Sequence, residues 1–196
     1  MKTNAKSNSD VLIDGKSVEN VTDCKHLGSY LNADGNINRE ITARIVMAST
    51  AFYKLNNIWK SNRMMKDTKL KLYTSNVRSV LLNASETWKT NQRIESKLRG
   101  FEGRCPRRVL GIRWEHRVTN KEISERTGIR QIVEEVNRKR WRWLGHVLRM
   151  SKPRHPLFAL TWNPQGARKK GRPQSTWRRS VENERVESGK TYNELN

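Results

Sequence analysis

The sequence has little of what secreted, membrane-spanning or disulfide-stabilised proteins need. Its 196 residues include two cysteines, and hydrophobic residues make up 34% of the chain, with a mean hydropathy of −0.90. Two cysteines do not build a disulfide framework, which favours a reducing compartment. No apolar run approaches the ~18 residues of a spanning helix, and the first residues form no apolar signal segment. We therefore expect an intracellular protein, nuclear or cytoplasmic, without a membrane partner.

Groups that converge on catalysis are also missing from the sequence. The five aspartates are scattered, whereas two-metal phosphoryl transfer needs carboxylates that hold two cations about 4 Å apart. A glycine-rich phosphate loop, a Ser-His-Asp signature and a His-Glu-x-x-His motif are absent. Cys24 with His26, and Cys105 with His116, do not complete a tetrahedral zinc set. We therefore predict no catalytic residue, no metal site and no cofactor in this chain.

Positive charge is what the sequence has in excess. Lys and Arg number 40 against 19 Asp and Glu, which gives a net charge of +21. Residues 101–180 hold 21 of these cations against six glutamates and no aspartate, a net of +15. So local an excess favours a surface that binds a polyanion over a general solubility device. An anionic membrane surface would also attract it.

Strand signals are confined to the N-terminal part. Asp14-Gly15, between residues 11–13 and 18–21, predicts a hairpin with a two-residue turn. A third short strand is predicted over residues 24–31. Asp34-Gly35 follows this strand and is expected to end it.

Apolar residues recur at helical spacing through most of the remaining chain. Asn36 and Asp67 are the expected N-caps of the first two helices, and Thr119 opens a capping box. Pro106 lies inside the third pattern and is expected to kink or end that helix, because it lacks an N–H. After Pro153 the periodicity is lost. The predicted helices cover residues 37–60, 68–83, 91–110, 119–127, 129–150 and 174–187.

Residues 138–150 combine five cations with two tryptophans. At about 100° per residue, Arg138, Arg142 and Arg149 fall within about 40° of one another. They form a cationic stripe suited to a phosphate backbone, which we prefer to the alternative of a merely solvated helix face. We call these three residues the α-helical stripe.

Two aromatic residues and one arginine of the same tract lie on other faces. Trp143 falls on the apolar face, which predicts packing in place of base stacking. Trp141 lies opposite that face, where stacking on a base and packing on a neighbouring helix are both open. Arg140 falls on the apolar face, so it must either reach outward to solvent or have an acidic partner.

A second basic run follows near the C-terminus. It reads ARKKGRPQ over residues 167–174 and looks like a flexible linker. Contact with phosphates, a nuclear import signal and a plain linker are all open for it, and we favour phosphate binding. The candidate side chains are Arg168, Lys169, Lys170 and Arg172.

Six strings, in order along the chain, resemble one family. Residues 21–31 (VTDCKHLGSYL) resemble the F-x-Y-L-G segment that follows the palm in reverse transcriptases of non-LTR (LINE-type) retrotransposons. Residues 80–88 (VLLNASETW) resemble the family's LLYGSETW, and residues 101–112 (FEGRCPRRVLGI) resemble FE-x-RCLRRILGI. Residues 41–55 resemble the first thumb helix. Residues 142–150 and 171–177 complete the series.

The resemblance implies a template- and primer-holding part of such an enzyme. Leu27 and Gly28 would take a primer-grip-like position. The partner would be an RNA template, an RNA–DNA hybrid or DNA. Mg²⁺ would belong to the intact enzyme, whose Tyr-x-Asp-Asp motif would precede Met1. The implied division is the end of the palm over 1–35, a thumb-like bundle over 36–111, a C-terminal helical region over 112–160, and a basic linker with a terminal helix over 161–196.

The chain also departs from the family pattern. Cys24 and His26 stand where the family has Phe and Tyr, Asn83 replaces a Tyr, and Pro106 replaces a helical Leu. Such departures are consistent with a decaying copy or with a fragment free of selection.

Composition, periodicity and resemblance together predict a mostly α (α+β) protein. A short N-terminal β-hairpin segment would precede a multi-helix bundle and a basic flexible tail. The predicted function is that of a truncated piece of an RNA-directed DNA polymerase that binds nucleic acid at most and does not polymerise alone. The alternatives are a stand-alone basic nucleic-acid-binding or chromatin-associated scaffold, and a non-functional relic.

Overall fold

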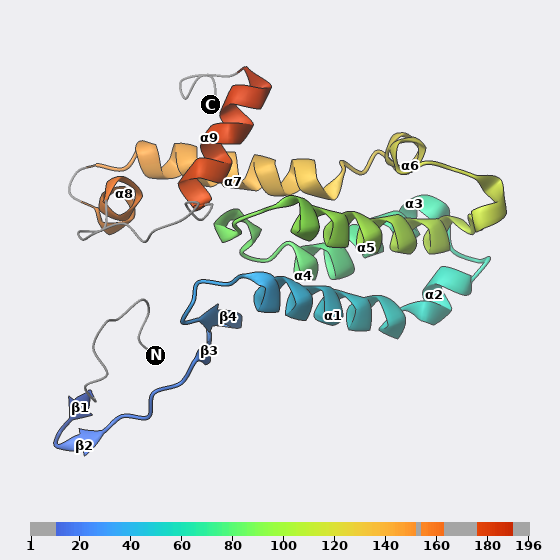
Figure 1. The fold of residues 1–196 in the computed structure, drawn as a ribbon. Coiled ribbons are helices and arrows are strands. Elements are labelled where there is room, and N and C mark those ends of the chain that lie inside the picture. Colours follow the sequence, from blue (N-terminus) through green and yellow to red (C-terminus); the bar gives the residue numbers. More distant parts are fainter. Residues whose placement is uncertain (1–10, 152–153, 163–175, 190–196) are drawn as a thin grey trace.

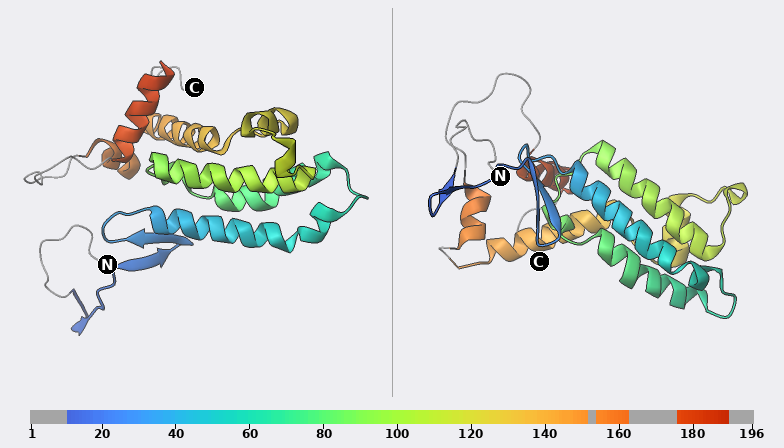
Figure 2. Two further views of the ribbon diagram at one scale, coloured as in Figure 1. Left: turned by 45° about the vertical axis from the view of Figure 1, so that its right-hand side comes forward. Right: turned by 90° about the horizontal axis from the view of Figure 1, so that it is seen from below.

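The computed structural model describes residues 11–151, 154–162 and 176–189. Within these ranges the chain is mostly helical with short strands at its N-terminal end, as predicted. Figure 1 shows helices α1, α5 and α7 in successive layers, with the strands beyond the start of α1 and with α9 crossing α7. The turned view at the left of Figure 2 keeps this order. The helices are α1 (Asn38–Lys54), α2 (Asn56–Lys60), α3 (Lys66–Tyr73), α4 (Ser79–Leu81), α5 (Gln92–Leu110), α6 (Asn120–Thr127), α7 (Ile132–Leu148), α8 (His155–Thr161) and α9 (Trp177–Ser188).

The first hairpin forms at the predicted turn. Asp14 and Gly15 have φ values of 50° and 77°, the left-handed conformation that a two-residue hairpin turn requires. The strands are β1 (Leu12–Ile13) and β2 (Lys16–Ser17). The prediction of the second strand over residues 18–21 was therefore wrong, because so short a turn pairs the residues on either side of it directly.

The single strand predicted over residues 24–31 is instead a second hairpin. Strands β3 (Asp23–His26) and β4 (Ser29–Asn32) pair antiparallel. Leu27 and Gly28 form the turn with φ values of 47° and 83°. Leucine seldom adopts positive φ, so this turn is not evident from the sequence.

A buried ion pair fixes this second hairpin to the start of α1. Arg44 pairs with Glu40 at 2.7 Å between Nε and Oε1. The Arg44 guanidinium also donates to the Gly28 carbonyl at 3.2 Å, and the backbone N–H of Tyr30 donates to Glu40 Oε2 at 2.6 Å. The turn is thus held in place by residues more than ten positions away.

The first two predicted helices are each divided. Residues 37–60 break at Leu55, between α1 and α2. Asn36 accepts a hydrogen bond from the backbone N–H of Asn38 at 3.0 Å, although the cap position itself is one residue later. The second helix begins at Lys66, so Asp67 lies in its first turn and is not its cap. A π-helical turn over Thr74–Arg78 separates α3 from α4.

Pro106 does not end α5. The helix begins after Asn91, close to its predicted start, and the Asn91 side chain caps it by accepting from the Ile94 N–H; the helix continues to Leu110. Gly111 ends it with a φ of 70°. Cys105, Pro106 and Val109 are all buried, and this packing offsets the hydrogen bond that the proline removes.

Buried residues at the predicted helical spacings form one core that joins α1, α3, α5 and α7. Aromatic side chains make up much of it, with Phe52 stacked on Trp59 at 5.2 Å between ring centroids. The core contains residues from both sides of position 111, so the helices before and after that position share it. Its fully or nearly fully buried members include Ile41, Tyr73, Val77, Leu81, Trp88, Ile94, Leu98, Phe101, Ile132 and Val136.

Helix α7 is shorter than the predicted 129–150. It starts at Ile132, and Gln131 at its cap position provides no side-chain hydrogen bond. Glu102 of α5 supplies the cap instead, because its carboxylate accepts from the Ile132 N–H at 2.7 Å. The start of α7 is therefore set by a neighbouring helix.

The last helices agree with the sequence only in part. The capping box of Thr119 and Glu122 opens α6 as predicted. Helix α8 lies where no periodicity was found, with Pro156 in its first turn, a position that proline tolerates. Helix α9 is close to the predicted 174–187, with Thr176 as its cap and Val181 buried.

Candidate nucleic-acid interface

Arg140 is buried on the apolar face of α7 and has an acidic partner. Its side chain is 0% exposed and pairs with Glu184 of α9. The guanidinium also donates to the Trp88 carbonyl at 2.8 Å and to Thr90 Oγ1 at 3.2 Å. Of the two alternatives that the sequence left open for Arg140, the acidic partner is the one found. This arginine is thus unavailable to a ligand.

Trp143 packs within the protein, as its position on the helix predicted. Its ring lies edge-on to Trp177 of α9, with centroids 5.4 Å apart and planes at 85°. Trp177 in turn donates from its indole nitrogen to the Glu86 carbonyl at 2.8 Å. The contact between these two indoles joins α7 to α9.

The three residues of the α-helical stripe are exposed, Arg138 and Arg142 on α7 and Arg149 at its C-cap. Arg138 pairs with Glu135 at 2.6 Å, and the hydrogen bond that its guanidinium donates to that carboxylate raises the pKa of Arg138 above its ordinary value. Arg142 and Arg149 are exposed one and three turns further along. The neighbouring Lys139 belongs to the fold, since its ammonium donates to the Leu82 carbonyl at 2.9 Å. The helix therefore presents cations to solvent, while its role in binding remains a prediction.

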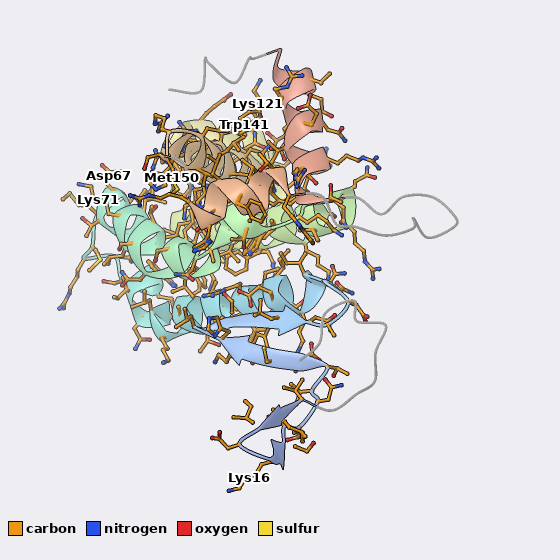
Figure 3. All side chains as sticks on the ribbon, turned by 90° about the vertical axis from the view of Figure 1, so that its left-hand side faces the viewer. Lys16, Asp67, Lys71, Lys121, Trp141 and Met150 are labelled. Carbon is orange, nitrogen blue, oxygen red and sulfur yellow. The ribbon has the colours of Figure 1, made fainter. Side chains whose placement is uncertain are left out.

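Trp141 is half-buried on α7. Figure 3 shows it within the helical part of the molecule, far from the hairpin tip that carries Lys16. Its intermediate exposure leaves both stacking on a base and packing on a neighbouring helix open for it.

The other predicted binding residues divide between an exposed turn and the undescribed part of the chain. Leu27 is 92% exposed at the tip of the β3–β4 turn, and the Gly28 carbonyl accepts from Arg44. The predicted primer-grip-like position is therefore a projecting turn with a fixed base. The basic run of Arg168, Lys169, Lys170 and Arg172 lies outside the described residues.

A pocket rich in arginine was missed by sequence reasoning. It lies along the C-terminal half of α5 and reaches the first residue of α6, with a volume of about 590 Å³. No carboxylate is among the residues that line it. We call it the arginine pocket. Its cationic members are Arg99, Arg104, Arg107, Arg108 and Arg113.

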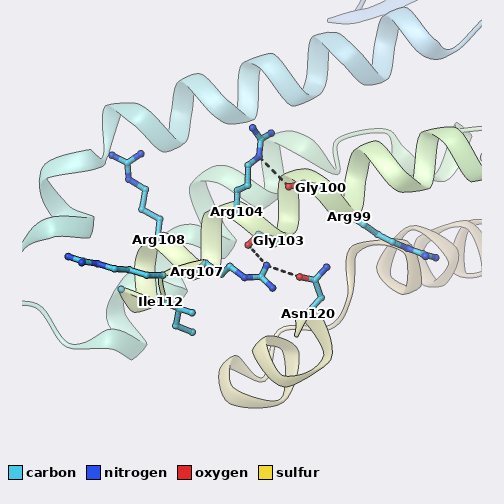
Figure 4. Close-up of a pocket in the computed structure, with 10 residues that line it drawn as sticks. Arg99, Gly100, Gly103, Arg104, Arg107, Arg108, Ile112 and Asn120 are labelled. Atoms are coloured by element: carbon cyan, nitrogen blue, oxygen red, sulfur yellow. Dashed lines mark hydrogen bonds between the residues drawn. The ribbon is translucent and has the colours of Figure 1, made fainter. Parts of the chain in front are cut away.

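The arginines of this pocket are held to different degrees. Arg107 is bound on three sides, to the Gly103 carbonyl at 2.6 Å, to Asn120 Oδ1 at 2.7 Å and to the Val118 carbonyl at 2.8 Å. Arg104 donates only from Nε, to the Gly100 carbonyl at 3.2 Å. Figure 4 shows Arg104 projecting to one side of α5 and Arg107 crossing toward Asn120. Arg107 thus joins α5 to α6, whereas Arg104 keeps its terminal nitrogens exposed.

Two other arginines of the pocket have side-chain partners on the surface. Arg99 pairs with Glu95 at 3.1 Å on the exposed surface of α5. Arg108 donates to Asn56 Oδ1 at 2.8 Å and lies 5.7 Å from the centroid of the Tyr53 ring. The signal that could have revealed the pocket is the pair of glycines in a helix otherwise rich in arginine.

Burial shifts the pKa values of the titratable groups near the core. Burial raises the pKa of the Cys105 thiol to about 12 and raises that of the Tyr73 hydroxyl further above its ordinary value. Cys105 therefore stays protonated at neutral pH, which excludes it as a nucleophile. Burial also raises the pKa of Glu102, against the hydrogen bond from Ile132 and the charge of Arg78.

Within the described residues, no group of three or more His, Cys, Asp or Glu side chains is placed to hold a metal ion. In that same part of the chain, every helix is too short or too polar to cross a bilayer.

Comparison with known proteins connects the chain to transposons. Residues 51–82 match a family model described as a domain of unknown function (DUF6451). Over 174 residues the chain is 27% identical to an uncharacterized transposon-derived protein of Caenorhabditis elegans. The chain resembles a transposon-derived protein. The alignment covers 85% of this chain and 61% of that protein, so the chain spans about three-fifths of the relative's length. No solved structure matches.

Proposed function

We propose that this chain is a nucleic-acid-holding part of a transposon-derived protein. Its nearest functional counterpart would be the thumb and C-terminal helical region of a non-LTR retrotransposon reverse transcriptase. Two findings support the proposal: the six ordered strings that resemble that family, and the 27% identity to a transposon-derived protein. The proposed partners are an RNA template, an RNA–DNA hybrid or DNA.

The observation that carries the proposal is that some side chains of α7 pack inside the protein while its exposed arginines face solvent. Trp143 is turned into the protein, and Arg140 is neutralised by Glu184, while Arg142 and Arg149 face solvent. An exposed face of cations contacts phosphates, which are the same in every sequence. Base edges would be read by other groups. Binding is therefore expected to be strong at low salt and independent of sequence.

The test is fluorescence anisotropy with a labelled single-stranded RNA and a labelled RNA–DNA hybrid across a series of salt concentrations. For a single strand, each phosphate contact contributes about 0.7 to the slope of log K against log salt. The double variant Arg142→Gln/Arg149→Gln should lower that slope by about 1.4. The matched control is Lys60→Gln/Lys71→Gln, which removes two exposed charges from α2 and α3. Binding that does not depend on salt, or no binding at low salt, contradicts the proposal.

Polymerisation is not part of the proposed function. The five aspartates of the chain are scattered and form no recognisable catalytic set. Primer extension with Mg²⁺ and nucleotides should therefore give no product. Robust extension by the purified chain would mean that it contains an active site.

A further inference from the structure

The arginine pocket is a concave cationic surface that lies away from the α-helical stripe. It is built from α5 and the start of α6, whereas the stripe lies on α7. Five arginines line a volume of about 590 Å³ without a carboxylate among them. Like charges gathered in this way repel one another, and a bound anion relieves that repulsion.

The fold itself uses only part of this charge. Arg107 is committed to the α5–α6 contact through its three hydrogen bonds. Arg104 and Arg113 are exposed, and the terminal nitrogens of Arg104 project from the helix, as Figure 4 shows. Guanidinium groups bind phosphate oxygens with paired N–H donors. Structural needs therefore explain Arg107 but not the exposed terminal nitrogens of Arg104 or the exposed Arg113.

Gly100 is a second, independent feature of the pocket. It lies in the middle of α5, where glycine costs about 1 kcal/mol relative to alanine. A Cβ at this position would meet nothing within 4 Å, so internal packing does not require glycine. Gly103 differs, because a Cβ there would lie 2.9 Å from Arg107 Nη1. A bare backbone on an open surface permits the close approach of a bulky ligand.

We propose that the arginine pocket binds the phosphodiester backbone of a nucleic acid, with Gly100 as the point of closest approach. This assignment rests on the proposed function and adds a second contact site to it. Arg104 and Arg108 line the pocket one turn apart on the same face of α5, about 6 Å along the helix. One strand of a duplex presents about two phosphates over that length. Two guanidinium groups at this spacing thus match consecutive phosphates of a backbone better than a single small anion.

The experiment compares two substitutions that differ by one charge. Gly100→Glu places a carboxylate in the pocket, and Gly100→Gln places a neutral group of the same shape there. Binding of labelled single-stranded RNA and of an RNA–DNA hybrid is measured by anisotropy at low salt, with circular dichroism to verify folding. We expect Gly100→Glu to bind about tenfold more weakly than Gly100→Gln, and with a smaller salt slope. Lys71→Gln, which also lowers net charge by one but lies outside the pocket, should bind like the unaltered chain.

The possible outcomes separate this assignment from the proposed function. If the unaltered chain binds no nucleic acid, both fail. If it binds, and Gly100→Glu and Gly100→Gln bind equally, only the assignment of the pocket is overturned. If Gly100→Glu does not fold, Arg104→Gln/Arg113→Gln replaces it, with the same loss expected. If poly-glutamate binds to the pocket more tightly than RNA does, the pocket is assigned to an acidic protein and the nucleic-acid assignment is overturned.

Discussion

The buried pair of Arg140 and Glu184 gives the sharpest test of how this fold is held together. Arg140 has a fully buried side chain, and Glu184 is 14% exposed. Burial raises the pKa of Glu184 even though Arg140 lowers it, so desolvation outweighs the attraction between the two charges. Removing one partner should therefore be costly, while removing both should not.

The magnitude follows from what each substitution leaves behind. Glu184→Gln leaves the Arg140 guanidinium buried with only the Trp88 carbonyl and Thr90 hydroxyl as strong acceptors. Breaking a buried pair in this way costs about 3–5 kcal/mol. With a urea m-value of about 2 kcal/mol/M, the midpoint should fall by about 2 M. The double variant Arg140→Met/Glu184→Leu should regain most of this loss, because apolar groups of similar volume need no counterion.

The assay is urea unfolding followed by tryptophan fluorescence, with Glu95→Gln as the control. Glu95 pairs with Arg99 on the surface of α5, where a single pair contributes less than about 1 kcal/mol. If Glu184→Gln loses no more stability than Glu95→Gln, the reasoning is refuted. The reasoning also fails if the double variant is as unstable as the less stable single variant. That result would mean that the ion pair itself stabilises the fold, and that the cost does not come from leaving one charge buried without a partner.

Three further outcomes are expected. Gly100→Ala should raise the free energy of unfolding by about 0.5–1 kcal/mol, because alanine favours the helix and its methyl group meets nothing; a decrease in urea unfolding contradicts this. Hydrogen bonds from the Thr119 backbone and hydroxyl lower the pKa of Glu122, so its stabilising contribution is present above the ordinary value of 4.5 and is lost as pH falls through the folded pKa. The difference in melting temperature between the unaltered chain and Glu122→Gln should shrink in acid. A thiol reagent at pH 8 should modify Cys24 much faster than the buried Cys105, and equal rates contradict that burial.

Most of the helical fold follows from the sequence because the signals are local. Apolar residues at helical spacing place Ile41, Phe52 and Leu98 in the core, since each helix must bury one face. Asn91 and Thr119 accept hydrogen bonds from backbone N–H groups three residues later, so they fix helix starts without help from other elements. The net charge of +15 over residues 101–180 is likewise evident from the sequence, because it is a count of residue types.

Other features of the fold could not be predicted because they depend on distant partners or on several weak effects together. Pro106 was expected to end or kink α5, but its buried position in the core carries the helix onward. The second hairpin turns at Leu27, a residue that propensity does not favour there, because α1 holds the Gly28 carbonyl. Helix α8 has no clear periodicity of its own.

The sequence by itself determined the class of the fold, the capping box of α6 and the basic character of residues 101–180. Only the tertiary structure decided which cations remain for a ligand. It paired Arg140 with Glu184, 44 residues away, and capped α7 with Glu102, 30 residues before Ile132. It also brought the arginines of α5 against the start of α6 to form a pocket. The reason is physical. The charge of each residue follows from its type, whereas its burial, its ion-pair partner and the shape of the surface around it depend on contacts between elements distant in the chain.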